Sequence, residues 1–150
     1  MISRSIKDTS SIAAEFARGL EPRLNDREEG VLATVIALHG DLGSGKTTFT
    51  KAFAAALGIP EEEVTSPTFV IEKRFDIHGS AFFKRLIHID AYRLERPEEI
   101  ERLGWKQTLA DKANLVLVEW PENIGSAMPQ NVPTISFTFI DENTREIVFN

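Results

Sequence analysis

The feature that most constrains this chain is the stretch GDLGSGKT at residues 40–47, which fits the pattern Gly-x4-Gly-Lys-Thr of a phosphate-binding loop. Gly40 and Gly45 let the backbone turn tightly and bring its N–H groups to a phosphate without a Cβ in the way. Lys46 is expected to reach the β- and γ-phosphates of a nucleotide, and the Thr47 hydroxyl to bind Mg²⁺ beside them. The pattern is short, so its surroundings decide whether it is a chance match.

The segments on either side of this loop supply the required context. The preceding run VLATVIALHG is continuously apolar and rich in β-branched residues, which is typical of a parallel strand buried on both faces. The following segment KTTFTKAFAAALG places apolar side chains on one stripe and ends at Gly58, which predicts a helix. Strand, loop and helix in this order indicate a nucleotide site.

The rest of the chain alternates between apolar strand patterns and helical ones. The sequence predicts a first helix capped by Asp8 or Thr9, followed by a loop over 21–30. The apolar face of this helix is formed by Ile12, Ala13, Phe16, Ala17 and Leu20. The sequence further predicts a hairpin from 68–77 and 81–90, a short helix over 96–104 with Pro97 at its first position, a buried strand over 114–120, and a hairpin from 132–140 and 145–150. We therefore expect one α/β domain over 1–150, a P-loop NTPase-like three-layer fold with a mixed parallel/antiparallel sheet.

Two carboxylates stand at the ends of apolar strand patterns. Glu119 ends LVLVE and Asp90 ends LIHID. Ligands of open α/β sheets bind at the carboxyl ends of the strands, where a phosphate loop needs an acid to position Mg²⁺. A lone acid at a strand end usually sits in water, but two of them beside a phosphate loop predict site residues. Alanine at either position is expected to preserve folding and abolish hydrolysis.

Composition excludes several classes of function. The chain has no cysteine, which excludes disulfides, thiol catalysis and cysteine-bound metals. Its net charge of −6 argues against a broad basic face for nucleic acid. A local patch on the first hairpin could meet RNA or an acidic protein face, or be a solvated edge: Lys73, Arg74, Lys84 and Arg85. No run approaches the ~18 apolar residues of a membrane span, so we expect a cytoplasmic protein.

The absence of one tetrapeptide argues against a GTPase. Asn/Thr-Lys-x-Asp, which reads guanine, does not occur. A small P-loop kinase that phosphorylates a small molecule stays open, with Arg93, Arg96 and Arg102 as a candidate lid or as a solvated helix face. An ATPase that serves a partner and a non-hydrolysing nucleotide sensor stay open as well.

Four stretches, taken together, resemble a known family. GDLGSGKTTFTKAFAAALGI, VTSPTFVIEKRF, IHIDAYRLERPEEIERLGW and LVLVEWPENIG occur in the order and spacing of the bacterial TsaE family, the ATPase of tRNA threonylcarbamoyladenosine biosynthesis. The resemblance covers residues 8–147. It implies that the chain hydrolyses Mg·ATP to support partner subunits that transfer threonylcarbamoyl to adenosine 37 of tRNAs reading codons that begin with A. Direct contact with tRNA is left open.

The same resemblance assigns roles to residues. It implies that Thr47 and Glu119 bind Mg²⁺, that Asp90 is needed for hydrolysis together with Lys46, and that Thr9 or Ser10 touches the base. The resemblance also implies a basic residue near the C-terminus that approaches the nucleotide, and Arg145 is the candidate in the last strand. The loop residues expected to hold ATP are Asp41, Leu42, Gly43, Ser44, Gly45, Lys46, Thr47 and Thr48.

Three further positions receive an interpretation. The SPTF stretch at 66–69 is expected to be a switch or partner-facing segment, as the family match implies. Trp120, next to Glu119, packs near the active site or belongs to the core, whereas Trp105 is expected to be structural. His88 alternates with Ile87 and Ile89 and is interpreted as a sheet-face or core histidine.

Overall fold

A computed structural model describes residues 1–22, 28–64 and 71–150 of the chain. Its centre is a seven-stranded sheet in the order β1-β7-β6-β2-β5-β4-β3. The strands are β1 (Ile2–Ser3), β2 (Thr34–His39), β3 (Glu72–Asp76), β4 (Arg85–Asp90), β5 (Asn114–Glu119), β6 (Thr134–Phe139) and β7 (Arg145–Phe149). The helices are α1 (Ile6–Arg18), α2 (Lys46–Ala56), α3 (Glu98–Glu101) and α4 (Trp105–Leu109), with short 3₁₀ turns at Glu61–Glu63, Pro121–Asn123 and Gly125–Ala127.

The sheet is mixed in the predicted manner. Strands β6, β2, β5 and β4 run parallel to one another in its centre. Strand β3 pairs antiparallel with β4 on one side, and β7 pairs antiparallel with β6 on the other. Strand β1 pairs antiparallel with β7 at the edge. The predicted fold class, a P-loop NTPase-like α/β fold with a mixed sheet, is confirmed.

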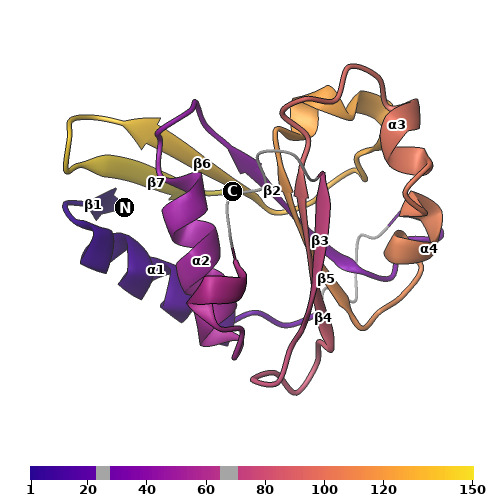
Figure 1. Cartoon of the computed structure of the whole chain (residues 1–150), viewed down its shortest axis with the longest axis horizontal. Helices are drawn as coiled ribbons and strands as arrows, with labels where there is room; N and C mark the ends of the chain where they lie inside the picture. The colour runs from indigo at the N-terminus through magenta and orange to yellow at the C-terminus, as the bar shows by residue number, and fades with distance from the viewer. Residues whose placement is uncertain (23–27, 65–70) are drawn as a thin grey trace.

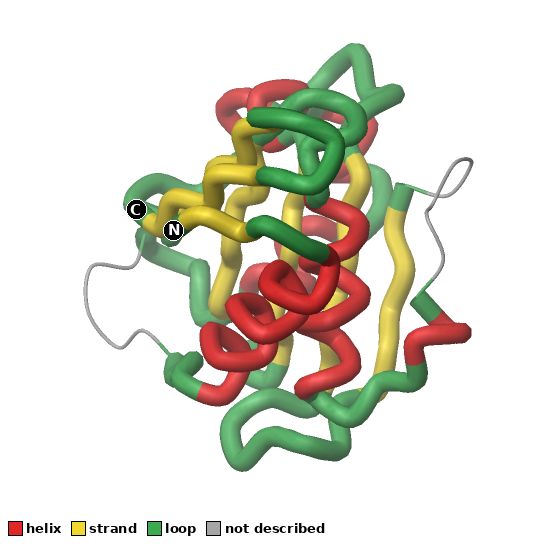
Figure 2. The backbone as a smooth tube through the Cα atoms, turned by 90° about the vertical axis from the view of Figure 1, so that its left-hand side faces the viewer, coloured by secondary structure: helices red, strands yellow, loops and turns green. Residues whose placement is uncertain are grey.

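Helices cover both faces of the sheet, so the fold has three layers (Figure 1). Helices α1 and α2 lie side by side on one face, and α3 and α4 lie on the other (Figures 1 and 2). Successive side chains of a strand point to opposite faces, and the two central strands follow this rule. On the α2 side, Ile36 and Leu38 pack with Phe49 and Phe53. The other face is filled by apolar side chains of the strands and of α3 and α4: Val35, Val116, Val118, Ile87, Ile89, Ile100 and Trp105.

Three local predictions need correction. Helix α1 begins at Ile6, and its N-cap is Ser5, not Asp8 or Thr9. The Ser5 Oγ accepts from the Asp8 N–H at 3.1 Å, and Asp8 Oδ2 accepts from the Arg4 N–H at 2.9 Å. The apolar side chain of this first turn, Ile6, is 74% exposed, so the buried apolar stripe that reveals the helix in the sequence begins farther along the chain.

The other two corrections concern short elements. The second strand of the first hairpin begins at Arg85, because residues 81–84 form the connection instead. The predicted helix over 96–104 is only the single turn α3, with Pro97 as its N-cap. Gly104, in the left-handed conformation, then starts α4, in which the Trp105 Nε1–H donates to the Ala127 oxygen at 2.8 Å. Part of the predicted loop over 21–30 and the first residues of the predicted strand 68–77 lie outside the described residues.

Candidate active site

The phosphate-binding loop connects the carboxyl end of β2 to the first turn of α2. All three of its glycines have backbone conformations that other residues rarely adopt, with φ of 151° at Gly40, 77° at Gly43 and 105° at Gly45, the N-cap of α2. A Cβ on Gly40 would lie 2.6 Å from Ser44 Oγ and 2.7 Å from the backbone oxygen of Phe137 in β6. The loop therefore packs directly against the neighbouring strand, and the glycine at its start follows from that contact.

Lys46 is buried beneath this loop. Its Nζ donates to the backbone oxygens of Gly40 and Asp41, the latter at 3.0 Å. Burial lowers the pKa of Lys46, and the carboxylates of Glu119 and Asp90 oppose that shift. The ammonium group is thus held against loop carbonyls, close to two acids, at the mouth of a helix N-terminus that favours anions.

Asp90 and Glu119 end adjacent parallel strands and are partners in the register of β4 and β5. The alternation of side chains places Glu119 on the same face as Leu115 and Leu117, which pack on the α2 side. Asp90 follows Leu86, another residue of that face, by four positions. Both predicted acids therefore face the layer that contains the phosphate loop, and the structure brings them together with Lys46.

Asp90 is held in a tight turn at the end of β4. The Tyr92 N–H donates to Asp90 Oδ1 at 3.0 Å. Burial raises the pKa of Asp90 and the nearby Glu119 carboxylate raises it further, whereas the Tyr92 N–H lowers it. The net upward direction favours a carboxyl group able to accept and hold a proton.

Two aromatic rings stand beside these acids. Trp120 follows Glu119 in the left-handed conformation, with φ of 56°. Lys46 Nζ lies 4.7 Å from the centroid of its ring, and the Tyr92 ring lies 5.1 Å away on a tilted plane. Trp120 thus contacts Lys46 and also packs against the core on the α3 side of the sheet, so it combines both predicted positions. Tyr92, which sequence reasoning missed, is marked only by its place two residues after Asp90.

Two buried polar atoms show that the residues present fit a magnesium nucleotide. Ser44 Oγ and Glu119 Oε1 have no hydrogen-bond partner among residues 1–22, 28–64 and 71–150. Buried polar atoms are nearly always paired, so unpaired ones at a phosphate loop are consistent with a ligand site. Over the same residues, no group of three His, Asp or Glu side chains forms an all-protein metal cage. Mg²⁺ commonly binds through one or two carboxylates plus substrate phosphates, and Glu119 supplies a buried carboxylate beside the loop.

Arg145 and Thr9, the residues expected to contact the nucleotide from outside the phosphate loop, differ in their surroundings. Arg145, at the start of β7, lies against the loop, because a Cβ on Gly45 would be 3.6 Å from Arg145 Cγ. Its guanidinium group donates to the Asp141 and Thr144 oxygens and stacks 4.6 Å from the Phe139 ring. Thr9 is buried in α1, where its hydroxyl bonds Ser3 Oγ at 2.7 Å. Its contact with a base, like that of Ser10, stays a prediction.

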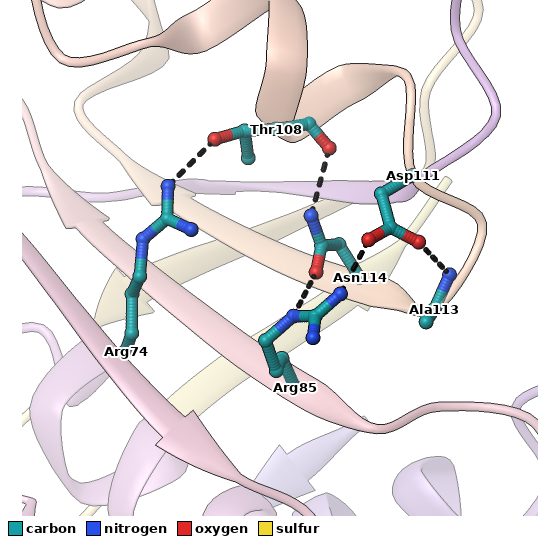
Figure 3. Close-up of polar contacts among 6 residues, drawn as sticks. All are labelled: Arg74, Arg85, Thr108, Asp111, Ala113 and Asn114. Atoms are coloured by element: carbon teal, nitrogen blue, oxygen red, sulfur yellow. Dashed lines mark hydrogen bonds and ion pairs between the residues drawn. The ribbon is translucent and has the colours of Figure 1, made fainter.

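Basic side chains of the first hairpin are partly committed to the fold itself (Figure 3). The Arg85 guanidinium group donates to Asn114 Oδ1 at 2.9 Å and pairs with Asp111. Arg74 donates to Thr108 Oγ1 at 2.9 Å. These contacts tie the hairpin to α4 and the start of β5, at the end of the strands opposite Asp90 and Glu119. Arg74 and Arg85 therefore stabilise the fold through internal hydrogen bonds. The sequence interpretations of the patch, a binding surface or a solvated edge, did not include this role.

Two remaining positions complete the comparison with the sequence. The SPTF stretch lies outside the described residues, so its role as a switch stays a prediction. His88 is buried on β4, as expected for a sheet-face histidine, and its Nε2 lies 3.5 Å from Glu119 Oε1. The described part of the chain contains no helix long and apolar enough to cross a membrane.

Comparisons with known proteins agree with this architecture. The family model described as "Threonylcarbamoyl adenosine biosynthesis protein TsaE" matches residues 3–147. A Treponema pallidum protein named tRNA threonylcarbamoyladenosine biosynthesis protein TsaE is 35% identical over 97% of this chain and 96% of its own length. A Bacillus subtilis protein of the same name is 41% identical over 77% of this chain and 68% of its own.

A solved structure supports the same relationship at the level of the fold. The crystal structure of Bacillus subtilis YdiB superposes with a TM-score of 0.71 at 31% identity, covering 99% of this chain and 82% of that one. The family match extends from the first strand to the last, so it includes the loop, both strand-end acids and the closing hairpin. The chain therefore belongs to the TsaE family of threonylcarbamoyladenosine biosynthesis proteins.

Proposed function

We propose that this chain is a Mg²⁺-dependent ATPase that supports the threonylcarbamoylation of adenosine 37 in tRNAs reading codons that begin with A. It binds Mg·ATP at the loop over 40–47 and hydrolyses it to ADP and phosphate. The transfer chemistry itself belongs to protein partners, the threonylcarbamoyl-transferase subunits, which use this hydrolysis to complete their cycle. The TsaE family membership supports the pathway, and the site supports the reaction.

One observation carries the proposal. Lys46 is buried beneath the phosphate loop and donates to its carbonyls, and Asp90 and Glu119 end adjacent parallel strands as register partners. A buried cation, two acids on neighbouring parallel strands and a helix N-terminus are the groups needed to position a triphosphate for in-line attack. A loop that only bound phosphate would not require the second acid.

Each residue then has a defined task. The loop N–H groups hold the β-phosphate, and Lys46 exchanges the Gly40 and Asp41 oxygens for oxygens of the β- and γ-phosphates. Asp90, with Oδ1 fixed by the Tyr92 N–H, orients the attacking water and accepts its proton as the bond between the β,γ-bridging oxygen and the γ-phosphorus breaks. The raised pKa of Asp90 suits this acceptance.

Thr47 and Glu119 are the residues that would hold Mg²⁺. When bound, the cation neutralises charge that develops on the phosphate oxygens during transfer. Thr47 is exposed at the first turn of α2, and Glu119 is buried on β5. Their combination of one hydroxyl and one carboxylate leaves coordination positions for phosphate oxygens and water.

The first experiment measures phosphate release from ATP by the purified chain, with and without Mg²⁺. Asp90→Asn and Glu119→Gln are expected to lose hydrolysis by at least ~100-fold, as removal of a positioned acid or base typically does. Asp90→Asn should retain nucleotide binding. Phosphate transfer to an added small-molecule acceptor in place of release would instead favour a kinase, and unchanged hydrolysis in both variants would refute the assignment.

The second experiment tests the pathway. In cells depleted of this protein, threonylcarbamoyladenosine in total tRNA is quantified by mass spectrometry after complementation with wild type or Lys46→Met. We expect wild type to restore the modified nucleoside and Lys46→Met to fail at equal expression. Restoration by Lys46→Met would refute a role for ATP in the process.

A further inference from the structure

The buried histidine of β4 has no established task in the site described above. His88 is 4% exposed, and neither its Nδ1 nor its Nε2 has a hydrogen-bond partner in the described part of the chain. Glu119 Oε1 is likewise buried without a partner, and it lies 3.5 Å from His88 Nε2. Burying these three polar atoms without hydrogen bonds destabilises the folded protein. Nε2 and Oε1 face each other, so this cost falls if they become paired in another state of the protein.

The strand geometry explains why these two side chains face each other. His88 stands two residues before Asp90, so both point to the α2 face of the sheet. On the adjacent strand, Leu117 is the register partner of His88, and Glu119 follows it on the same face. The imidazole therefore lies behind the carboxylate, on the side away from the strand end where the phosphate loop begins.

We propose that His88 is a positioning residue for Glu119. Its imidazole Nε2–H donates a hydrogen bond to Glu119 Oε1 when the magnesium nucleotide binds, and this contact holds the carboxylate in place for the cation. This inference rests on the proposed function, because it requires Glu119 to be a Mg²⁺ ligand.

General experience with metal sites supports this role. Carboxylates that bind metals are themselves usually hydrogen-bonded, and loss of that outer partner weakens metal affinity. Hydrogen bonds of active sites are often long before the substrate binds and shorten in the complex. The separation of 3.5 Å is just beyond ordinary hydrogen-bond length, so a small side-chain rotation closes it.

The experiment measures ADP affinity by calorimetry over a range of Mg²⁺ concentrations, which avoids hydrolysis. His88→Leu is expected to weaken the apparent affinity for Mg²⁺ in the presence of ADP by roughly 10- to 100-fold. The affinity for ADP without Mg²⁺ should stay unchanged. His88→Gln, whose amide nitrogen can take the place of Nε2, is expected to restore most of the loss. His88→Asn, whose amide stands at the place of Nδ1, is expected not to restore it.

Stability measurements separate this role from packing. The His88→Leu substitution removes two unpaired buried nitrogens, so the melting temperature without nucleotide should stay the same or rise. Thr34→Val is the matched control, because Thr34 Oγ1 is also buried and unpaired but stands at the opposite end of β2. It should leave the Mg²⁺ dependence unchanged. A His88→Leu protein that keeps wild-type Mg²⁺ dependence would overturn the proposal.

A spectroscopic measurement of the His88 tautomer tests the inference without binding data. The chain has 3 histidines, so ¹⁵N spectra of labelled imidazoles can be assigned by substitution. We expect His88 to be the Nε2–H tautomer in the Mg·ADP complex, and an Nδ1–H tautomer would overturn the inference even in an active ATPase. Wild type that binds no magnesium nucleotide would overturn the proposed function, and this inference with it.

Discussion

Lys46, Asp90 and Glu119 are ionisable side chains that the sheet holds partly or wholly out of water. Burial favours the neutral form of each of the first two, since it lowers the pKa of Lys46 and raises that of Asp90. Such groups reduce the free energy of unfolding of the nucleotide-free protein. The site is thus maintained at a cost to stability, as is common where function requires charges in a cleft.

The first prediction concerns the pH dependence that Asp90 causes. Its folded-state pKa lies above the unfolded value of 3.8, so the folded state binds more protons in the interval between the two. The contribution of Asp90 to stability therefore falls as the pH rises from below 3.8 through the raised pKa. Asp90→Asn removes this fall. The stability of the variant relative to wild type should increase as the pH rises from about 4 to about 7 in urea unfolding, and a constant or decreasing difference would contradict it.

The second prediction concerns Gly40. An alanine there has to displace the backbone oxygen of Phe137, which would lie 2.7 Å from its Cβ, and also adopts a φ of 151°. We expect Gly40→Ala to lower the free energy of unfolding by at least ~1–3 kcal/mol, the range for strained backbone positions. Urea denaturation measures this loss.

A second glycine supplies the control for that experiment. Gly30 has a φ of 82°, and nothing lies within 4 Å of its added Cβ. Gly30→Ala should show only the backbone cost of ~1–2 kcal/mol. Equal losses in the two variants would show that the contact with β6 does not explain the glycine at the start of the phosphate loop.

The site residues differ in how far sequence alone could identify them. Asp90 and Glu119 were accessible because each ends an apolar run, and parallel strands bring such ends to one edge. The contact between His88 and Glu119 could not be predicted, because it depends on the register between β4 and β5. The first residues of these strands, Arg85 and Asn114, are 29 positions apart in the sequence. The alternation of side chains along a strand does place His88 on the same face as Asp90. This is the part of the arrangement that the sequence indicates.

At the scale of elements, length and burial decide what a sequence reveals. The central strands β2 and β5 are almost uninterrupted apolar runs, because helices cover both of their faces. Strand β1 has two residues and exists only through its pairing with β7, so no local pattern announces it. Helix α4 is five residues long, too short to show a helical period.

The third prediction concerns the polar contacts between the first hairpin and the start of β5. Arg85→Met leaves the buried Asn114 Oδ1 without its donor, so the free energy of unfolding should fall by ~1–3 kcal/mol. Nucleotide affinity should stay unchanged, because these residues begin the strands that Asp90 and Glu119 end. Thermal unfolding and ADP calorimetry give the two values.

Lys84 next to it provides a matched variant. It is exposed, and Lys84→Met removes the same kind of charge without breaking the contact with Asn114. Its stability should remain within about 0.5 kcal/mol of wild type. A similar loss in both variants would mean that the charge of the hairpin, and not its internal hydrogen bonds, supports the fold.

At the scale of the whole molecule, the site brings together the ends of four strands and the first turn of α2. The loop follows β2, the two acids end β5 and β4, and Arg145 of the closing hairpin lies against Gly45. A ligand bound there contacts segments from distant parts of the sequence. Binding should therefore stabilise the entire fold and not one element of it.

The fourth prediction follows from this arrangement. Mg·ADP at about 100 times its dissociation constant should raise the free energy of unfolding by ~2.7 kcal/mol. Chelation of Mg²⁺ should remove most of that gain in a thermal shift measurement. Lys46→Met should show no gain at the same ligand concentration. A full gain in this variant would exclude Lys46 from phosphate binding.

The position of β2 in the sheet has a consequence for how the protein is made. Strand β2 spans Thr34–His39, but its neighbours β5 and β6 begin only at Asn114 and Thr134. A growing polypeptide thus carries its phosphate loop through most of translation with no sheet to hold it. Pairings so distant in sequence form late and slowly. The proposed nucleotide site is therefore assembled only after β5 and β6 have been synthesised and have paired with β2.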